Sequence, residues 1–458
     1  MLVGLLLTFA WRQYAAEATF GICRNCNVIV IGVDTLRADR VHALGYFRDT
    51  TPTIDALAGR GYVFSQAIAP ASWTVPSFMS IFTGVYPSVH KVVNKYRVFT
   101  EETQILSNLE TLSPNIQTLA QVLKNEGYAT GGFTGDAGVS SKFGYGQGFD
   151  VYTDEKAFGG LENSENHALA WLDTQKENNF FMFFHGYDLH GQFPPPTQER
   201  YVDVTYTGSY TGTPKEEEIL REEVLTPHGV ELTSSDVSFW NAVYDNKVRS
   251  ADEKLGAFLS KLSDRGMLSR TLIVVVSDHG EEFYEHGGFD HGHSLYDELI
   301  HVPLLFIVPG MTGGVTISSQ VSTMDVMPTI LHLLGIRQSQ GIEAQLRGRK
   351  NLAEYFTNPA GPGSDVYSET DYRGYTHKRS IRTADGWKYI MTLESGAEEL
   401  YNLNTDTKEK TNLIGVELEI AETLRVGLRQ HLEQDLRTDL SNRPSISCLP
   451  VYQGECQQ

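Results

Sequence analysis

The sequence has few cysteines, a deficit of positive charge and no long hydrophobic run near its start. Its 458 residues include 4 cysteines, and 37 Lys and Arg stand against 57 Asp and Glu, for a net charge of -20. This acidity argues against nucleic acid as a partner, because phosphate backbones select surfaces rich in Lys and Arg. It does not exclude an anionic substrate, because a bound cation can reverse the sign of the charge locally.

The apolar run at residues 2–11, LVGLLLTFAW, is too short to cross a bilayer as a helix, which takes about 20 residues. The small-residue stretch AAEA follows it and resembles a signal-peptide cleavage site near Ala18, although the positively charged start of a signal peptide is missing. We therefore expect an exported protein that is periplasmic, secreted or attached to a membrane through its N-terminus. A truncated start, or a buried strand or helix, are the alternatives for this segment.

The four cysteines form two close pairs, Cys23 with Cys26 and Cys448 with Cys456. A C-x-x-C pair is half of a zinc pattern, but no second C-x-x-C completes it. Disulfides that bridge the chain ends, or idle thiols, are the expected alternatives. The even count of cysteines fits an exported protein.

Strand and helix signals alternate over the first 350 residues. The composition, 41% hydrophobic and 21% charged, is that of a globular protein, and the length allows two to four domains. Continuous apolar runs alternate with helical stretches, most of them closed by glycine, which predicts a parallel sheet covered by helices on both faces. The predicted strands are 27–34, 179–188, 271–280 and 302–310, and the predicted helices are 51–61, 115–128, 244–266 and 323–335.

After about residue 350 the pattern changes. Short alternating strands with polar turns follow over 367–406, and a closing helix is predicted near 418–435. There is no internal repeat and no low-complexity tract. We expect a signal-like or anchoring segment (1–26), a main catalytic domain (27–350) and a C-terminal α+β subdomain (351–458).

Polar residues gather where three of the predicted strands end. Asp34 ends the first strand, Asp278 and His279 end the strand 271–280, and His185 and Asp188 end the strand 179–188. Ligands of an open parallel sheet bind beyond the carboxyl ends of its strands. Asp34 alone would be interpreted as a helix cap. Carboxylate and imidazole together are a common ligand set for divalent metals, so the sequence predicts a metal site at this edge.

The stretch ASWTVPSF poses a question about Thr74. Pro76 suits the first position of a helix, which places Thr74 at the helix N-terminus, where free N–H groups favour a bound anion. Thr74 is then either a capping residue or a nucleophile, because a hydroxyl coordinated to a metal ionises more readily. Spacing alone does not choose between the two.

Four blocks of the chain resemble, in order, the sulfatase family within the alkaline phosphatase superfamily. They are VIVIGVDTLRADRVHALGY, PASWTVPSFMSIFTGVYPSVH, HGYDLHGQFPPP and VVVSDHGEEFYEHGGFDHGHSLYDELIHVPLLF, and the likeness continues to about residue 415. The resemblance implies an alkaline-phosphatase-like α/β fold. Such a fold has a large mixed, mostly parallel sheet covered by helices on both faces, with a smaller C-terminal antiparallel sheet and helix.

The resemblance also implies a role for six residues of this chain. Asp34, Asp278 and His279 match metal ligands, and Thr74 matches the nucleophile and is expected to be a further ligand. His190 matches a histidine of the substrate block and His291 a position near the scissile ester, and both are expected to be catalytic and to bind substrate. His185 and Asp188, at the end of the strand 179–188, are also expected to bind substrate.

Two departures separate the chain from sulfatases proper. In those enzymes a Cys or Ser within Cys-x-Pro-x-Arg is oxidised to formylglycine, whereas here Thr74 and Phe78 stand at the nucleophile and arginine positions. Thr35 replaces the second acid of the usual Asp-Asp pair, and HGYDLHG lacks the Asp-x-x-x-His ligands of two-metal relatives. We therefore expect no formylglycine and a single divalent ion: Ca, Mg, Mn or Zn.

The expected activity is hydrolysis of phosphate monoesters or diesters, or of sulfate esters, through a covalent intermediate on Thr74. Phosphorus is favoured, because a phosphothreonine can be cleaved by attack at phosphorus, whereas a sulfated threonine lacks the elimination route of the formylglycine hydrate. The alternatives are a phosphoglycerol or phosphoethanolamine transferase, a sulfuric ester hydrolase proper and a degenerate binding protein. The expected substrate is a small molecule or a glycan or lipid ester; neither its identity nor the oligomeric state follows from the sequence.

The departures lead to a first prediction. Mass spectrometry of the peptide that contains Thr74 will show an unmodified threonine, or a trapped phospho or sulfo adduct. An aldehyde at this position would contradict the interpretation of Phe78 and restore ordinary sulfatase chemistry.

Overall fold

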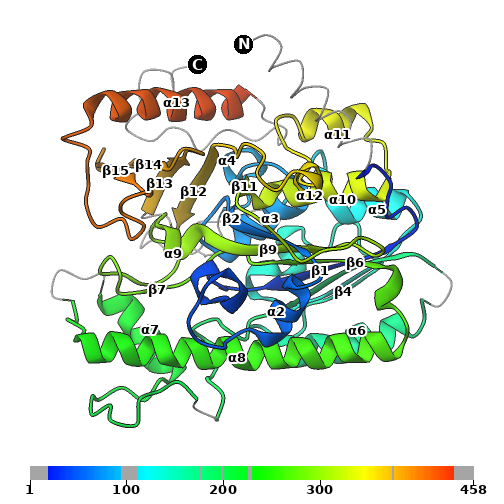
Figure 1. The fold of residues 1–458 in the computed structure, drawn as a ribbon, viewed down its shortest axis with the longest axis horizontal. Coiled ribbons are helices and arrows are strands. Elements are labelled where there is room, and N and C mark those ends of the chain that lie inside the picture. The colour runs from blue at the N-terminus through cyan, green and yellow to red at the C-terminus, as the bar shows by residue number, and fades with distance from the viewer. Residues whose placement is uncertain are drawn as a thin grey trace, which may run out of the picture.

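The computed structural model describes residues 19–93, 111–175, 178–197, 200–224, 229–373 and 376–437. A nine-stranded sheet runs through the molecule between two layers of helices (Figure 1). Its strands lie in the order β10-β2-β9-β6-β1-β5-β3-β4, with β11 also paired to β2. Their bounds are β1 Asn27–Val33, β2 Tyr62–Ile68, β3 Ala129–Phe133, β4 Val151–Thr153, β5 Phe180–Gly186, β6 Thr271–Val276, β9 His301–Ile307, β10 Val315–Ile317 and β11 Val321–Ser322.

Most neighbouring strands of this sheet are parallel. In the centre, β1 pairs in parallel with both β5 and β6, so that Val30 lies level with Phe183 and Val274. The exception is β9, which is antiparallel to β6 and to β2. The predicted strand 302–310 is therefore confirmed, and its antiparallel course makes the sheet mixed but mostly parallel, as the resemblance implies. The chain returns from β6 through loops and the short helix α9 (Asp297–Ile300), not through a long crossover helix of the kind that usually joins parallel strands.

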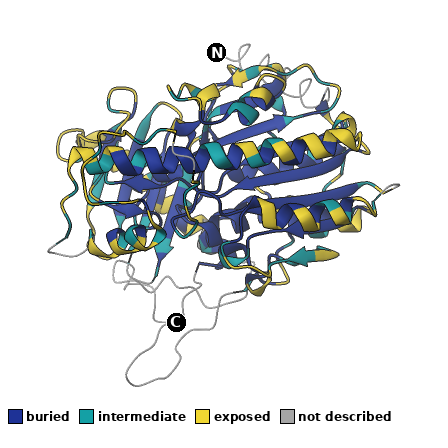
Figure 2. Ribbon diagram, turned by 90° about the horizontal axis from the view of Figure 1, so that it is seen from below, coloured by how far each residue is buried: buried dark blue, intermediate teal, exposed yellow. Residues whose placement is uncertain are grey.

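Alternate residues of the strands supply two hydrophobic cores. On β1, Val28 and Val30 belong to the core that includes α3, α5 and α10, whereas Ile29 and Ile31 belong to the core that includes α2, α6 and α8. Figure 2 shows the sheet buried and the exposed residues on the outer sides of the helices. The helices are α2 Pro52–Ala58, α3 Thr74–Thr83, α4 Pro87–His90, α5 Leu119–Asn125, α6 Leu161–Leu172, α7 Pro214–Glu223, α8 Ser234–Asp264, α9, α10 Val326–Leu334, α11 Gln340–Gln345, α12 Glu354–Thr357 and α13 Leu418–Arg437.

The predicted helix 244–266 is the second part of a longer helix, α8. It begins at Ser234, where Thr233 accepts a hydrogen bond from the backbone N–H of Asp236, and the Asp236 carboxylate accepts the backbone N–H of Thr233. This reciprocal capping box satisfies N–H groups that a helix start leaves without partners. The full length of α8 lets it cover one face of the sheet (Figure 1).

The C-terminal part forms a separate sheet. Strands β12 (Val366–Tyr372), β13 (Thr376–Arg382), β14 (Trp387–Thr392) and β15 (Glu398–Asn402) are antiparallel in sequence order, and α13 packs on them. Two short strands of the main part, β7 (Glu282–Phe283) and β8 (Phe289–Asp290), pair with each other. The predicted fold class is confirmed, whereas the division at residues 26 and 350 stays a prediction.

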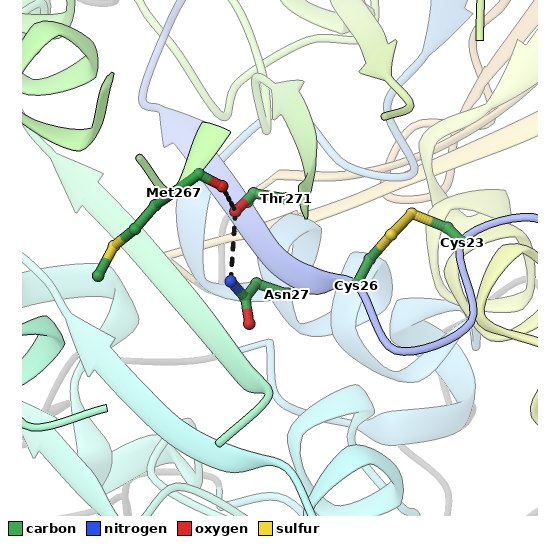
Figure 3. The surroundings of a disulfide bond; sticks show 5 residues. All are labelled: Cys23, Cys26, Asn27, Met267 and Thr271. Carbon is green, nitrogen blue, oxygen red and sulfur yellow. Dashed lines mark hydrogen bonds between the residues drawn. A yellow bond between two sulfur atoms is a disulfide. The ribbon is translucent and has the colours of Figure 1, made fainter. Parts of the chain in front are cut away.

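The first cysteine pair forms a local disulfide. Cys23 and Cys26 are bonded to each other immediately before β1, where Asn27 donates a hydrogen bond to Thr271 of β6 (Figure 3). A bridge from these cysteines to the other chain end is therefore wrong, as are idle thiols and a zinc site at this pair. Cys448 and Cys456 lie outside the described residues.

The apolar segment 2–11 and the cleavage-like site near Ala18 also lie outside the described residues. Among the helices that the structure describes, none combines the length and the apolar character needed to cross a lipid bilayer. The predicted membrane attachment through the N-terminus stays a prediction.

The packing between β1 and α3 leads to a second prediction. A Cβ atom on Gly32 would lie 2.7 Å from the Phe78 ring, so Gly32→Ala will overpack this contact and lower the free energy of unfolding by about 1–3 kcal/mol. Gly59→Ala is the matched control, because its Cβ would meet no atom closer than 3.6 Å and its φ is -62°. Chemical denaturation of both variants checks this, and equal stabilities would contradict it.

Candidate active site

Two adjacent parallel strands end at the same edge of the sheet and bring three predicted ligands together. Asp34 follows β1, and Asp278 and His279 follow β6. One ligand atom from each of the three lies within 4.8 Å of the others, and all three residues are fully buried. The cluster is compact enough for one ion to bridge it, given ligand distances of about 2–2.6 Å.

The backbone around the cluster is held by short polar contacts. Thr35 has a φ of 58°, which turns its N–H toward Asp278 Oδ1 at 3.3 Å. On the other side, Ser77 of α3 donates a hydrogen bond to the Asp278 carbonyl at 2.6 Å. The N-terminal part of α3 is thereby attached directly to the loop that carries the β6 ligands.

Thr74 is the first residue of α3, and its hydroxyl points to the cluster. Thr74 Oγ1 lies 3.3 Å from His279 Nε2. The capping position is Trp73, and no side chain caps this helix end. The interpretation of Thr74 as a cap is therefore wrong, and so is the placement of Pro76 at the first helical position, because the helix begins two residues before it.

Phe78 is buried behind the cluster. Its ring packs edge-on against Phe183 and His185, with centroid distances of 5.5 and 5.2 Å, and it fills the space over Gly32. The position at which the resemblance expects an arginine therefore belongs to the hydrophobic core of this chain.

The cluster has the ligand atoms of a cation site, and their lone pairs are not used by hydrogen bonds from the described residues. His279 Nδ1 lies 2.8 Å from the Gly280 carbonyl, which places the proton there and leaves the Nε2 lone pair available. Asp34 Oδ1 and Asp278 Oδ2 are buried and have no hydrogen-bond partner among the described residues. Unpaired buried carboxylate oxygens are costly, and a divalent ion would satisfy both.

The two carboxylates lie close enough for the charge of one to shift the pKa of the other. Burial by itself would raise the pKa of Asp34, but the His185 hydrogen bond at 3.4 Å and the nearby His190 and His279 hold that pKa well below its ordinary value. Burial and the charge of Asp34 raise the pKa of Asp278 well above its ordinary value. Burial also lowers the pKa of His279 to about 3, which keeps this imidazole neutral. Two ionised carboxylates so close together need a cation between them.

Two of the predicted substrate residues lie beside this cluster. The His291 ring centroid is 4.3 Å from that of His279 and 4.8 Å from that of His190. His190 also packs against Phe158 and Tyr187, and both histidines are almost fully buried. The structure therefore brings His190 and His291 to the same side of the cluster.

Two acids that the sequence analysis missed hold His291. Its Nδ1 lies 2.6 Å from Asp290 Oδ1 and 3.0 Å from Glu281 Oε1. Burial by itself would lower the pKa of His291, but these carboxylates raise it well above its ordinary value. Glu281 lies two residues after His279, and Asp290 directly precedes His291. This closeness in sequence is the signal that could have indicated the two acids, although neither residue ends a predicted strand.

The remaining predicted residues have other contacts. His185 borders the cluster through Asp34, as described above. Asp188 instead accepts hydrogen bonds from the Leu161 backbone and from Lys254, both at 2.7 Å, so its carboxylate fixes local structure. Two further histidines near His291 have carboxylate partners of their own, because His286 contacts Glu298 and His293 contacts Glu282.

The comparison with known families agrees with this geometry. The Sulfatase family model matches residues 26–336, which is more than half of the chain. The chain belongs to the sulfatase family. It is thereby a member of a family of sulfuric ester hydrolases.

Individual relatives have low sequence identity to this chain but match it over most of its length. Arylsulfatase K of Bos taurus is 24% identical over 89% of this chain and 80% of its own length. A protein solved with its substrate D-glucosamine-2-N,6-O-disulfate has a TM-score of 0.66 and 20% identity, covering 92% of this chain and 99% of its own. A phosphonate monoester hydrolase from Silicibacter pomeroyi has a TM-score of 0.68 and 18% identity, covering 91% and 96%. At these identities, the solved structures establish the shared fold.

The unpaired carboxylate oxygens of Asp34 and Asp278 lead to a third prediction. The purified protein will hold one equivalent of a divalent ion, and Asp278→Asn will weaken the affinity for it at least tenfold, because one charged ligand is lost. Metal analysis after dialysis, and the rise in melting temperature on adding Ca, Mg, Mn or Zn singly, check this. Asp252→Asn is the control, because this buried carboxylate accepts the backbone N–H groups of Thr53 and Ile54. Full metal content in Asp278→Asn would contradict the site.

Proposed function

We propose that this sulfatase-family protein is a metal-dependent hydrolase that cleaves phosphate monoesters or diesters, or sulfate esters, with Thr74 as nucleophile. The observation that carries the proposal is the contact of 3.3 Å between Thr74 Oγ1 and His279 Nε2, at the edge of a fully buried carboxylate pair with unpaired oxygens. A hydroxyl needs a nearby charge or base to become a nucleophile, and this cluster offers both.

Asp34, Asp278, His279 and Thr74 are the residues that would hold the metal. When bound, a divalent ion would supply the positive charge that lowers the pKa of the Thr74 hydroxyl and offsets the negative charge of the ester. With its proton released to solvent, Thr74 Oγ1 would attack the phosphorus or sulfur atom in line, and the bond from that atom to the leaving oxygen would break.

His190 and His291 are the proposed acids for the leaving alcohol. The carboxylates of Asp290 and Glu281 face Nδ1 of His291, so that Nε2, on the opposite side of the ring, is the atom placed to donate. Protonation of a leaving oxygen contributes roughly 10²–10⁴-fold to such reactions. Water then attacks the covalent ester and gives a proton back to the histidine that protonated the alcohol. This step releases phosphate or sulfate from a monoester, or the remaining monoester from a phosphate diester, and restores the threonine.

Threonine chemistry favours phosphorus over sulfur as the reacting atom. A phosphothreonine is hydrolysed by a second attack at phosphorus, whereas a sulfothreonine cannot use the elimination that a formylglycine hydrate provides. Structures of this fold are known for both reacting atoms. One relative is named a phosphonate monoester hydrolase, and another was solved with a disulfated glucosamine as its substrate. We propose small-molecule or glycan esters as the substrate class, and lipid esters as a further candidate.

We further propose that the protein is exported. The disulfide between Cys23 and Cys26 supports this, because such bonds persist in oxidising compartments and are rare in the cytosol.

The nucleophile leads to a fourth prediction. Thr74→Ala will abolish turnover with little change in melting temperature, and Thr74→Ser will keep part of the activity because serine offers the same hydroxyl. The assays use aryl sulfate, phosphate monoesters and diesters, and phosphonate esters, with Ca, Mg, Mn and Zn added singly.

Thr83→Ala is the matched control in the same helix. The Thr83 hydroxyl donates a hydrogen bond to the Met79 carbonyl, and Thr83 lies at the opposite end of α3 from Thr74. It will lose stability without losing turnover. Near-normal turnover by folded Thr74→Ala would refute the mechanism, and comparable losses in both variants would assign Thr74 a structural role.

A further inference from the structure

A loop that follows β3 lies directly against the side chain of Thr74. The loop covers residues 135–138 and leads into the short 3-10 turn Ala137–Val139. A Cβ atom on Gly138 would stand 2.7 Å from Thr74 Cβ and 2.8 Å from Thr74 Cγ2. Both distances are shorter than the separation of about 3.5–4.0 Å at which carbon atoms make favourable contact. Only the bare backbone of a glycine therefore fits against the methyl group of the proposed nucleophile.

The backbone of the 135–138 loop adopts conformations that are unusual for its residues. Asp136 has a φ of 58° with a ψ of -133°, and Ala137 has a φ of 50°, although neither is a glycine. A residue with a Cβ atom is sterically disfavoured at positive φ, so it persists there only where its surroundings fix it. Such residues gather at active sites, where their geometry is part of the mechanism. Two adjacent residues of this kind beside Thr74 indicate a loop that is held against the nucleophile.

The Tyr187 hydroxyl holds the loop through two hydrogen bonds. It accepts the backbone N–H of Gly138 at 2.7 Å and donates to the Asp136 carbonyl at 3.0 Å. Tyr187 directly follows β5 and is buried, so both bonds are shielded from solvent. Its ring packs edge-on against His185 and His190, with centroid distances of 4.7 and 5.4 Å. One side chain thus connects the loop with two histidines of the proposed site.

The loop contacts the one group that distinguishes threonine from serine, the methyl group Cγ2. A threonine side chain has more than one accessible χ1 rotamer, and the rotamer seen here directs Oγ1 to His279 Nε2, 3.3 Å away. Any other rotamer would move Cγ2 out of the space that it fills beside Gly138 and leave a gap there. The packed methyl group therefore fixes the direction of the hydroxyl, which the smaller side chain of a serine cannot do.

We infer that the 135–138 loop, held by the Tyr187 hydroxyl, encloses the Thr74 methyl group and thereby fixes the rotamer that aims Oγ1 at the ligand cluster. Gly138 and Tyr187 are positioning residues, and the site is built for threonine rather than serine as its nucleophile. This inference rests on the proposed function for the role of Thr74. It goes beyond that function by naming what directs the hydroxyl.

Tyr187→Phe is the informative substitution, because it removes the hydroxyl and keeps the ring against both histidines. The substrates are 4-nitrophenyl phosphate, bis(4-nitrophenyl) phosphate and 4-nitrophenyl sulfate. We expect kcat to fall about tenfold, because the Thr74 hydroxyl then spends time in unreactive rotamers, and KM to change by less than about twofold, because the binding groups stay in place.

The same substitution in the Thr74→Ser background tests whether the methyl group carries the effect. Serine has no methyl group for the loop to hold, so Tyr187→Phe will lower kcat there by less than about twofold. Equal losses of kcat in the two backgrounds, or a rise in KM in place of the fall in kcat, would overturn the inference.

Two further variants sharpen the test. Gly138→Ala places a methyl group directly against the Thr74 side chain and will lower kcat about a hundredfold. Tyr355→Phe is the matched control for the loss of a buried tyrosine hydroxyl, because Tyr355 of α12 donates to the Pro362 carbonyl. It will lose stability without losing turnover. A folded Gly138→Ala protein with the kcat of the parent would contradict the close contact between loop and nucleophile.

Failure of the proposed function can be distinguished from failure of this inference by a measurement that needs no turnover. In protein labelled with carbon-13 at the threonine methyl groups, the Thr74 signal is the one that is missing from Thr74→Ser. Three-bond couplings from this methyl carbon to the backbone nitrogen and carbonyl carbon report χ1. A single rotamer in the parent protein that becomes averaged in Tyr187→Phe supports the inference even if no ester is hydrolysed. Averaged couplings in the parent, or an unchanged rotamer in Tyr187→Phe, would reject it even in an active enzyme.

Discussion

The burial of two carboxylates side by side is the constraint on which the site depends. Asp34 and Asp278 have no exposed surface, and among the described residues each keeps an oxygen without a hydrogen-bond partner, with only His279 Nε2 lying 3.3 Å from Asp278 Oδ2. A buried charge of this kind costs far more than a hydrogen bond returns, unless a counter-charge is present. Because His279 is neutral and no hydrogen bond from the described residues satisfies these oxygens, a divalent cation is the natural counter-charge.

The fold around the cluster serves to hold that costly arrangement in place. Parallel pairing of β1 with β6 brings the two carboxylates to one edge, and the hydrogen bond from Ser77 ties α3 to the Asp278 loop. The close approach of Gly32 to Phe78 sets how near α3 comes to the sheet. Because the Thr74 hydroxyl begins that helix, its position relative to His279 follows from packing some distance away. The position of Thr74 in the proposed site is therefore a consequence of core packing.

The chain keeps the sulfatase-family fold, and Thr74 and Phe78 stand where the resemblance expects the formylglycine and the arginine. An arginine at position 78 would place a charge where the structure has an aromatic ring packed on Phe183 and His185. The polar surroundings that would steady an aldehyde hydrate are thereby replaced by core, which agrees with an unmodified threonine at position 74. On the opposite side, His291 between Asp290 and Glu281 keeps the polar character expected beside a leaving group.

Much of this protein was determined by the sequence itself. The continuous apolar runs at 27–34 and 271–280 were correctly predicted as strands, because a run buried on both faces carries a local signal, and their acidic ends indicated the cluster. The closing helix was predicted near 418–435 and forms α13, because its amphipathic pattern is also local.

Tertiary structure decided the rest. The antiparallel course of β9, the local Cys23–Cys26 bond and the start of α3 at Thr74 depend on which segments pack together, and a single sequence carries no such distances. The same holds for the partners of His291. Asp188 is expected at the substrate because it ends a strand, and only the structure shows that Lys254 of α8, far along the chain, bonds its carboxylate. The local sequence contains the residue types and indicates where strands end. The direction in which a buried side chain points is set by its neighbours in space.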